Sequence, residues 1–224
     1  MSGICQSRVV IITGAGGGLG AAHAREFAKE GASVVVNDIN QEAAAAVVEE
    51  INAAGGKAVA NHSDITHYDD AQNAVKQAIE VFGGLDIVVN NAGINRDRMF
   101  ASLSEAEWDA IMAVHLKGHF CISAHAVQYW RAQSKAGAAV AARIINTTSG
   151  AGLQGSVGQS NYAAAKAGIA ALTLNQAAEL GRYGITANAV APAARTAMTT
   201  AVESMATRMA KPEEGSLDYW AADN

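Results

Sequence analysis

A tyrosine and a lysine four residues apart, Tyr162 and Lys166, are the pair in this sequence best suited to acid–base chemistry. In a helix, residues i and i+4 lie on the same face, so the two side chains can act together. A tyrosine with its ordinary pKa of about 10 is a poor base at neutral pH. A neighbouring ammonium group favours the phenolate and lowers that pKa. The pair predicts a proton-transfer centre; the alternative is an ordinary Tyr and Lys on the surface of an amphipathic helix.

A glycine-rich run, Thr13 to Gly20, could bind a phosphate. It follows a short apolar run, and a helix-like segment comes after it. Glycine lets the backbone approach a pyrophosphate closely, and the helix offers unpaired N–H groups and the positive end of its dipole. The glycines alone are weak evidence, because any tight strand-to-helix turn favours glycine.

Asp38 strengthens this interpretation, since it ends the next strand-like run, 18 residues after Gly20. An acidic residue at that place can accept hydrogen bonds from the adenosine ribose hydroxyls and would repel a 2′-phosphate. Asp38 therefore predicts NAD rather than NADP as the cofactor. The alternative is that Asp38 caps the helix that begins near Asn40.

Strand-like and helix-like runs alternate along the whole chain. The predicted strands are Arg8–Thr13, Ser33–Asn37, Ala58–Asn61, Asp86–Val89, Arg143–Asn146 and Thr186–Val190. The predicted helices are Ala21–Glu30, Gln41–Ala54, Asp69–Phe82, Ser104–Arg131, which opens with a Ser104/Glu107 capping pair, and Asn161–Tyr183. This order predicts an α/β fold: a single Rossmann-type doubly wound parallel sheet with helices on both faces. Because no linker interrupts it, we expect one dinucleotide-binding catalytic domain over residues 1–224.

The bulk composition argues against several classes of protein. The net charge is −5 and no basic stripe is present, so we expect no nucleic-acid partner. No apolar run reaches the roughly 18 residues of a membrane span, so we expect no membrane contact. The two cysteines, Cys5 and Cys121, have neither metal-like nor redox-like spacing. We therefore expect no metal site and a cytoplasmic location.

Five motifs, in this order along the chain, resemble those of the short-chain dehydrogenase/reductase family. They are Thr13, Gly14, Gly18 and Gly20 of a Thr-Gly-x-x-x-Gly-x-Gly turn, Asp64, the run Asn90-Asn91-Ala92-Gly93, Ser149 with Tyr162-x-x-x-Lys166, and the segment Pro192 to Thr196. The resemblance implies a cofactor site formed by Gly14, Gly18, Leu19, Gly20, Asp38, Asp64, Asn91, Ala92, Gly93, Tyr162, Lys166, Pro192 and Thr196.

The resemblance also implies the catalytic roles. Ser149 orients the substrate oxygen, Tyr162 takes the alcohol proton as hydride leaves, and Lys166 hydrogen-bonds the nicotinamide ribose. His115 stands where the family usually has an asparagine that supports a helix kink and holds a water of the proton relay. Histidine can also donate and accept hydrogen bonds, so His115 is a further catalytic candidate. The alternative is a buried helical histidine satisfied by local contacts.

A narrower resemblance is to the dehydrogenase part of peroxisomal multifunctional enzyme type 2 and its bacterial relatives, which oxidise (3R)-hydroxyacyl-CoA with NAD. It lies in the segments 35–38, 56–61, 95–98 and 114–116. It implies an oxidoreductase that transfers a hydride between NAD(H) and a secondary alcohol or ketone, with a 3-hydroxyacyl-CoA as a candidate substrate. The alternatives are an NADPH-dependent 3-oxoacyl carrier protein reductase, against which Asp38 argues, and a cofactor-binding protein without turnover.

Three further expectations concern the substrate, the assembly and the end of the chain. An apolar wall for an acyl or alcohol substrate, or else routine core, is expected at Met99, Phe100, Leu153, Val157, Met198 and Met205. The resemblance implies a homodimer or homotetramer that pairs the two long helices, 104–131 and 161–183, across a two-fold axis. Family members continue into a last helix and a seventh strand, so we expect this chain, which stops at Asn224, to lack that strand.

Overall fold

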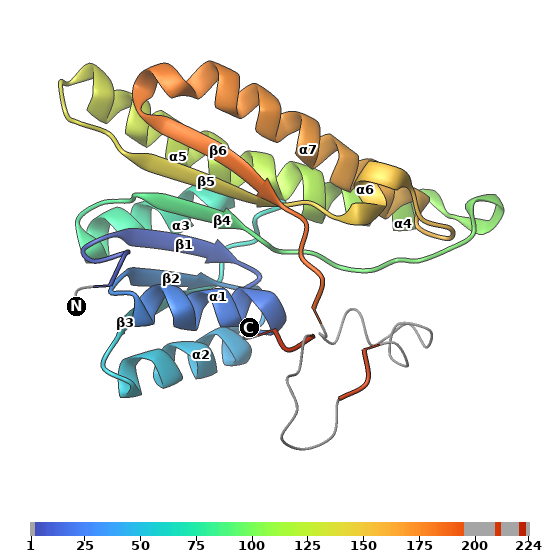
Figure 1. The fold of residues 1–224 in the computed structure, drawn as a ribbon, viewed down its shortest axis with the longest axis horizontal. Helices are drawn as coiled ribbons and strands as arrows, with labels where there is room; N and C mark the ends of the chain where they lie inside the picture. The colour runs from blue at the N-terminus through green and yellow to red at the C-terminus, as the bar shows by residue number, and fades with distance from the viewer. Residues whose placement is uncertain (1–2, 195–208, 212–219, 223–224) are drawn as a thin grey trace.

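A computed structural model describes residues 3–194, 209–211 and 220–222. Within them, six parallel strands form one sheet in the order β3-β2-β1-β4-β5-β6 (Figure 1). The strands are β1 Val9–Thr13, β2 Ser33–Asn37, β3 Lys57–Asn61, β4 Ile87–Asn90, β5 Ala142–Thr147 and β6 Ile185–Val190. This strand order is that of the doubly wound dinucleotide-binding fold, so the predicted fold class is confirmed.

Helices cover both faces of the sheet. They are α1 Gly18–Lys29, α2 Gln41–Ala53, α3 Tyr68–Phe82, α4 Glu105–Ile111, α5 Gly118–Lys135, α6 Gly150–Gln154 and α7 Ser160–Leu180. Side chains alternate along each strand: Ile12 and Val36 belong to the core against α1 and α2, whereas Ile11 and Val35 belong to the core against α3 and α5. Because both faces are covered at the centre of the sheet, β1, β2 and β4 are apolar and buried at most positions, as expected for parallel strands, whereas the outer strand β6 is exposed at four of its six residues.

The predicted helix 104–131 is wrong as a single element. It consists of α4, a π-helical turn η2 over Met112–Lys117, and α5, which extends to Lys135. The expected Ser104/Glu107 capping box is present at the start of α4. A π-helical turn adds a residue to one helical turn and changes the direction of the side chains that follow, which a simple 3.6-residue pattern does not reveal.

Smaller differences occur at the other elements. Helix α1 begins at Gly18, three residues earlier than predicted, because the last glycines of the turn already belong to the helix. Short helix α6 and the 3₁₀ turns η1 Phe100–Ser102 and η3 Gly181–Tyr183 were not predicted. No helix within the described residues is both long and apolar enough to span a bilayer.

Candidate active site

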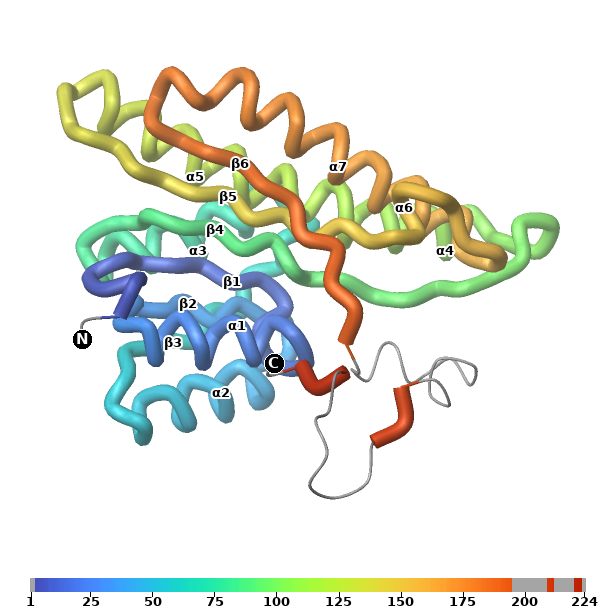
Figure 2. Tube along the Cα trace, viewed as in Figure 1, coloured from blue at the N-terminus to red at the C-terminus, as the bar shows by residue number. Residues whose placement is uncertain are grey.

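A cavity of about 360 Å³ opens at the carboxyl ends of the strands. In an open parallel sheet this is where ligands bind. The predicted site residues that line it are Gly14, Gly18, Leu19, Asp38, Asn91, Gly93, His115, Ser149, Tyr162, Lys166 and Pro192. Pro192 arrives from the segment that follows β6, which bends past the strand ends in Figure 2. Residues up to 180 positions apart in the chain, from 14 to 194, therefore meet in one cavity.

Four further residues line the cavity and were not predicted. They are Gly17, Thr147, Thr148 and Ala194. Thr147 is the last residue of β5, and Thr148 stands between it and Ser149. Their position at the carboxyl end of a strand was a signal that sequence reasoning could have used.

The glycine turn is shaped for the close approach of an anion. Gly14 has a φ of 63°, and a Cβ on it would lie 2.7 Å from the Cα of Ala92. A Cβ on Gly20 would contact the carbonyl oxygen of Gly14 and lie 2.6 Å from Nδ2 of Asn91. Gly17, the N-cap of α1, offers no side-chain cap, so the first N–H groups of the helix can face an anion. The turn therefore fits the pyrophosphate of a dinucleotide.

Asn91 and Ala92 brace this turn from the end of β4. Their backbone N–H groups donate to Oγ1 of Thr13 at 3.0 and 3.1 Å. The side-chain amide of Asn91 donates to the carbonyl oxygens of Thr13 and Gly14 at 3.0 and 3.2 Å. Asn91 also reaches the cavity, whereas Ala92 acts from behind the turn, where Gly14 packs against it.

Asp38 lines the cavity together with the glycine turn. Its Oδ2 accepts a hydrogen bond from the backbone N–H of Gly16, and its Oδ1 accepts one from Asn40, both at 2.9 Å. Helix α2 is capped by Asn40, whose side chain accepts from Ala43, so the alternative that Asp38 caps this helix is wrong. Each carboxylate oxygen has a second lone pair that can accept from a hydroxyl group.

Asp64 does not line the cavity. Its Oδ1 accepts hydrogen bonds from the backbone N–H and the hydroxyl of Thr66, at 2.8 and 2.7 Å, and Oδ2 lies 3.1 Å from Nδ1 of His67. Partial burial raises the pKa of Asp64, but the bonds from Thr66 and the neighbouring His67 outweigh it and hold that pKa below its usual value. Its expected contact with the adenine stays a prediction. Thr196, Met198 and Met205 lie outside the described residues.

Helix α7 brings Tyr162 and Lys166 to the cavity together, as their spacing predicts. The ammonium nitrogen of Lys166 lies 5.5 Å from the centroid of the Tyr162 ring. It donates a 2.6 Å hydrogen bond to the carbonyl oxygen of Thr147, and the Thr148 hydroxyl donates to the carbonyl oxygen of Lys166 at 2.8 Å. Only 2% of Lys166 is exposed. This burial disfavours the charged form and lowers the pKa of Lys166 to about 7.

The pKa of Tyr162 differs from the sequence-based expectation. Burial raises the pKa of Tyr162, a hydrogen bond with the Ser149 hydroxyl lowers it, and the negative charge of Asp97 raises it further. Lys166 does not lower the pKa of Tyr162 as expected, because burial has the larger effect on the phenol. Burial also lowers the pKa of Lys166, so the lysine is only partly charged near pH 7. The phenol is therefore neutral near pH 7 in this structure and is set up as a proton donor. Its use as a base requires added positive charge in the cavity.

His115 lies in the π-helical turn and is 1% exposed. Its Nε2 lies 2.8 Å from the carbonyl oxygen of Ile94 and 3.0 Å from the backbone nitrogen of the same residue. The ring meets the Tyr162 ring edge-on, with centroids 5.2 Å apart. Burial, together with the charge of Lys166, lowers the pKa of His115 to about 3 despite the bond to Ile94. The imidazole is thus neutral at physiological pH.

Only one of the two ring nitrogens of His115 is satisfied by local contacts. Nδ1 is buried and has no hydrogen-bond partner among the described residues. The ring packs on Gly93, where a Cβ would lie 2.5 Å from Cε1. The alternative of a locally satisfied buried histidine therefore holds for Nε2 and not for Nδ1, and the catalytic role of His115 stays a prediction.

The apolar candidates in the described part of the chain are not core residues. Met99, Phe100, Leu153 and Val157 are 61, 75, 69 and 87% exposed. They lie on two segments, one after β4 and one before Tyr162, which are joined by a 2.7 Å bond from the Arg98 N–H to the Gly158 carbonyl oxygen. Exposed apolar side chains on paired loops fit contact with a substrate better than routine packing. The expected wall itself stays a prediction.

Comparison of the sequence with known proteins identifies relatives of this chain. The family model described as short chain dehydrogenase matches residues 8–207. The chain is 51% identical over 175 residues to hydroxyacyl-CoA dehydrogenase ChsB1 of Mycobacterium tuberculosis, covering 75% of this chain and 55% of that protein. It is 42% identical over 174 residues to peroxisomal multifunctional enzyme type 2 of Mus musculus, covering 74% of this chain and 22% of that protein.

A solved structure is also similar. It is the crystal structure of a short chain dehydrogenase from Mycobacterium avium, with a TM-score of 0.84 and 62% sequence identity. The match covers 86% of this chain and 71% of that one. The present chain thus spans about half the length of the mycobacterial hydroxyacyl-CoA dehydrogenase and less than a quarter of the mouse protein.

Proposed function

Because this chain belongs to the short-chain dehydrogenase/reductase family, we propose that it is an oxidoreductase that transfers a hydride between NAD(H) and a secondary alcohol or ketone. The observation that carries the proposal is the single cavity in which Ser149, Tyr162 and Lys166 face the glycine turn. When bound, the nicotinamide supplies the hydride acceptor or donor. The turn, Asp38 and Asn91 are the parts of the chain suited to hold it.

The side chains supply the proton chemistry. The Ser149 hydroxyl hydrogen-bonds the substrate oxygen and orients it toward the phenol of Tyr162. In reduction, Tyr162 donates its proton to that oxygen; in oxidation, the phenolate receives the proton of the alcohol. Lys166, whose ammonium nitrogen lies 5.5 Å from the centre of the Tyr162 ring, would hydrogen-bond the nicotinamide ribose and adds positive charge when protonated. A screen for cofactor-dependent oxidation of secondary alcohols, with Tyr162→Phe as the inactive control, tests the proposal.

NAD is the proposed cofactor, because Asp38 follows β2 and lines the cavity together with the glycine turn. An acidic residue there can accept hydrogen bonds from ribose hydroxyls and would repel a 2′-phosphate. We expect NAD to bind at least about tenfold more tightly than NADP, since like charges at close range cost over 1 kcal/mol. Titration calorimetry of the wild type and Asp38→Asn measures this; the variant should lose most of the preference. Glu42→Gln, an acidic residue of α2 outside the cavity lining, is the matched control. Equal affinities in the wild type would contradict the assignment.

The proposed substrate is a 3-hydroxyacyl-CoA. The relative named hydroxyacyl-CoA dehydrogenase and the four exposed apolar side chains on the segments after β4 and before Tyr162 support it. The competing proposal, reduction of a 3-oxoacyl carrier protein with NADPH, is disfavoured by Asp38. The test compares 3-hydroxyacyl-CoA thioesters of both configurations with simple secondary alcohols. Faster turnover of the simple alcohols would remove the thioester proposal and leave the oxidoreductase proposal intact.

A homodimer or homotetramer built on α5 and α7 is the proposed assembly. An apolar groove with a volume of about 540 Å³ runs over these helices and the π-helical turn; it is lined by Asp109, Met112, Ala113, Leu116, Lys117, Phe120 and Leu172. Phe120 is 49% exposed there. Light scattering of Phe120→Glu should show dissociation, whereas Val81→Glu, which replaces a 50% exposed residue on α3, should not. A monomeric wild type would contradict the proposal.

Residence in the cytoplasm completes the proposal. Cys5 and Cys121 are both free thiols, as is usual in a reducing compartment. Fractionation of cells that express the full-length protein tests this, and recovery in an oxidising compartment would contradict it.

A further inference from the structure

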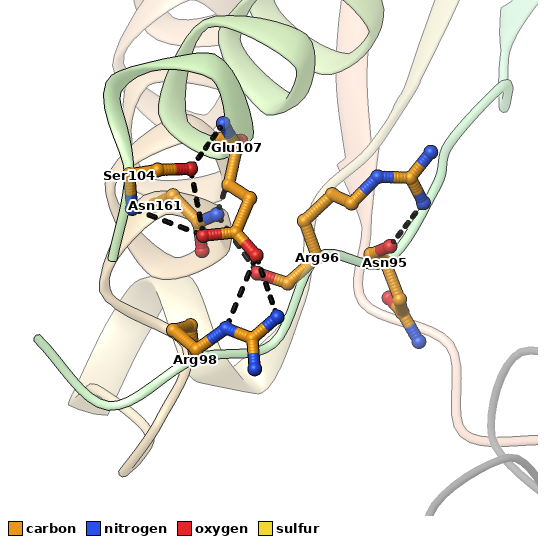
Figure 3. A network of polar contacts seen from close by, with 6 residues as sticks. All are labelled: Asn95, Arg96, Arg98, Ser104, Glu107 and Asn161. Carbon is orange, nitrogen blue, oxygen red and sulfur yellow. Dashed lines mark hydrogen bonds and ion pairs between the residues drawn. The ribbon is translucent and has the colours of Figure 1, made fainter. Parts of the chain in front are cut away.

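The first turn of α7 is tied to the segment that leaves β4. Figure 3 shows this network: Asn161 lies beside Ser104, and the dashed lines from Ser104 and Arg98 meet at the carboxylate of Glu107. Asn161 immediately precedes Tyr162 and is 0% exposed. The contacts join parts of the chain 54 and 65 residues apart.

One amide group makes three hydrogen bonds here. Nδ2 of Asn161 donates to the carbonyl oxygen of Arg96 at 3.1 Å and to that of Glu107 at 3.3 Å. Its Oδ1 accepts from the backbone N–H of Tyr162 at 2.8 Å. The N-cap residue Gln159 makes no side-chain cap, so Asn161 satisfies one of the free N–H groups of the first turn. These three bonds require two N–H donors and one acceptor in a single short side chain, and an amide group provides them.

An ion pair holds the other end of the network. The guanidinium of Arg98 donates to Oε1 of Glu107 through Nε at 3.1 Å and Nη2 at 2.9 Å. The second oxygen of Glu107 accepts from the backbone N–H and the hydroxyl of Ser104, at 3.0 and 2.9 Å. Bonds from the Ser104 backbone, Arg98 and the Ser104 hydroxyl lower the pKa of Glu107 to about 2. The carboxylate therefore stays charged and keeps α4 joined to the segment after β4.

The segment after β4 is also joined to the turn that precedes α7. The Arg98 N–H bonds the Gly158 carbonyl oxygen at 2.7 Å, and the Gln159 side chain donates to Asp97 at 2.9 Å. Met99, one of the exposed apolar residues, follows directly. The backbone around Tyr162 and the loop that carries Met99 thus form one hydrogen-bonded unit.

We propose that Asn161 is a positioning residue for Tyr162, with the Arg98–Glu107 pair as its outer support. Asn161 sets the first turn of α7 against the segment after β4, so that the phenol stands beside the Ser149 hydroxyl. The inference rests on the proposed oxidoreductase function, in which Tyr162 transfers the proton. A displacement of about 1 Å at a reacting group can cost up to about 100-fold in rate.

The test uses Asn161→Ala in the full chain. We expect kcat to fall about 10- to 100-fold, because the phenol loses its fixed position. NAD affinity should change less than about threefold, since the glycine turn is untouched. The pKa of Tyr162, followed by NMR with ¹³C-labelled tyrosine and assigned with Tyr162→Phe, should rise as the bond from Ser149 is lost. A parallel loss of kcat, cofactor affinity and melting temperature, with no change in that pKa, would show a merely structural role and overturn the proposal.

A second variant keeps the test decisive if Asn161→Ala does not fold. Glu107→Gln weakens the pair with Arg98, and we expect kcat to fall by about threefold to tenfold with NAD affinity retained. Glu50→Gln, which weakens the exposed Arg25–Glu50 pair at 2.8 Å between α1 and α2, is the matched control and should leave kcat unchanged. Equal kcat values for the two variants would overturn the proposal. A wild type that oxidises no hydroxyl substrate counts against the proposed function alone, since the pKa of Tyr162 still decides the positioning role.

Discussion

The cofactor end and the catalytic end of the cavity are built in different ways. At the cofactor end, buried polar side chains are paired: Asn37 donates to Asn61 at 2.7 Å and to the carbonyl oxygen of Ser63 at 3.0 Å, and Asn61 donates to Gln77 at 2.8 Å. At the catalytic end, buried atoms of β4, β5, the π-helical turn and α5 have no partner among the described residues. They belong to Asn90, His115, His119 and Thr147.

The difference shows which part of the cavity contains buried polar atoms without partners, which lower the stability of the fold. A buried polar atom without a partner costs about 1–3 kcal/mol unless a bound water satisfies it. The cofactor end carries no such cost at the residues named above, so its geometry is set before any ligand arrives. The catalytic end keeps a buried lysine, a neutral buried histidine and free polar atoms around the reacting group, as functional sites often do. The first end is expected to be sensitive to volume, and the second to charge and proton position.

The largest expected effect is at the phenol. Tyr162→Phe removes one oxygen and leaves the ring packing nearly unchanged, so turnover should fall by about 100-fold or more. NAD affinity, measured by calorimetry, should stay within a few fold, because the substitution leaves the glycine turn, the proposed phosphate site, untouched. The unaltered enzyme should oxidise its substrate faster as pH rises, since the phenolate is the base. Near-normal turnover of the variant would show that Tyr162 is not the proton-transfer group. It would also show that the catalytic end is not sensitive to proton position.

The cofactor end should respond to added volume. In Gly20→Ala the new Cβ would contact the Gly14 carbonyl oxygen and Nδ2 of Asn91, so the turn must shift. Overpacking of about 1–3 kcal/mol corresponds to a loss of NAD affinity of about 5- to 100-fold. Gly181→Ala, with no atom within 4 Å of the added Cβ, is the matched control and should bind NAD normally. Equal Kd values for the two variants would show that the turn is not preset.

The catalytic end should respond to charge. The folded pKa of Lys166 is about 7 and the unfolded value is about 10.4, so between these pH values the unfolded chain binds a proton that the folded chain does not. Stability should therefore rise with pH across this window, with a slope of up to about 1.4 kcal/mol per pH unit. Urea unfolding at pH 7, 8 and 9 should show that Lys166→Met lacks this contribution. Exposed Lys57→Met should keep the wild-type slope, and a slope shared by all three proteins would contradict the burial argument.

The smallest expected effect is at the π-helical turn. His115→Asn keeps a group that can bond Ile94, so turnover should fall less than about tenfold, the scale of one hydrogen bond. The lowered pKa of His115, about 3, means that its contribution to stability is lost as pH falls from about 6.5 toward 3. Unfolding measured at pH 6.5 and 4.5 should show a weaker acid dependence in the variant. A loss of turnover as large as that of Tyr162→Phe would instead make His115 an essential proton-transfer group.

The sequence by itself determined the features that short segments encode. Short, largely apolar runs predicted the strands, and the signal was clearest for β1, β2 and β4, which are buried on both faces. The glycines between β1 and α1 and the i, i+4 spacing of Tyr162 and Lys166 were sufficient to place both at one cavity. In a doubly wound parallel sheet the carboxyl ends of the strands lie at one edge, so the meeting of these residues there could be expected before any tertiary contact was known. The order of the strands came from the structure.

The tertiary structure decided the rest, because burial depth and long-range contacts are not written in local patterns. The bond between His115 and Ile94 spans 21 residues and occurs with the π-helical turn that interrupts the predicted helix. The bonds of Asn161 to Arg96 and Glu107 span 65 and 54 residues, and nothing in the spacing of these residues predicts them. The depth of Lys166 lowers its own pKa and removes the expected effect on Tyr162. The effect of a charge on a neighbouring pKa depends on the burial of both groups, and this burial exists only when distant segments have packed together.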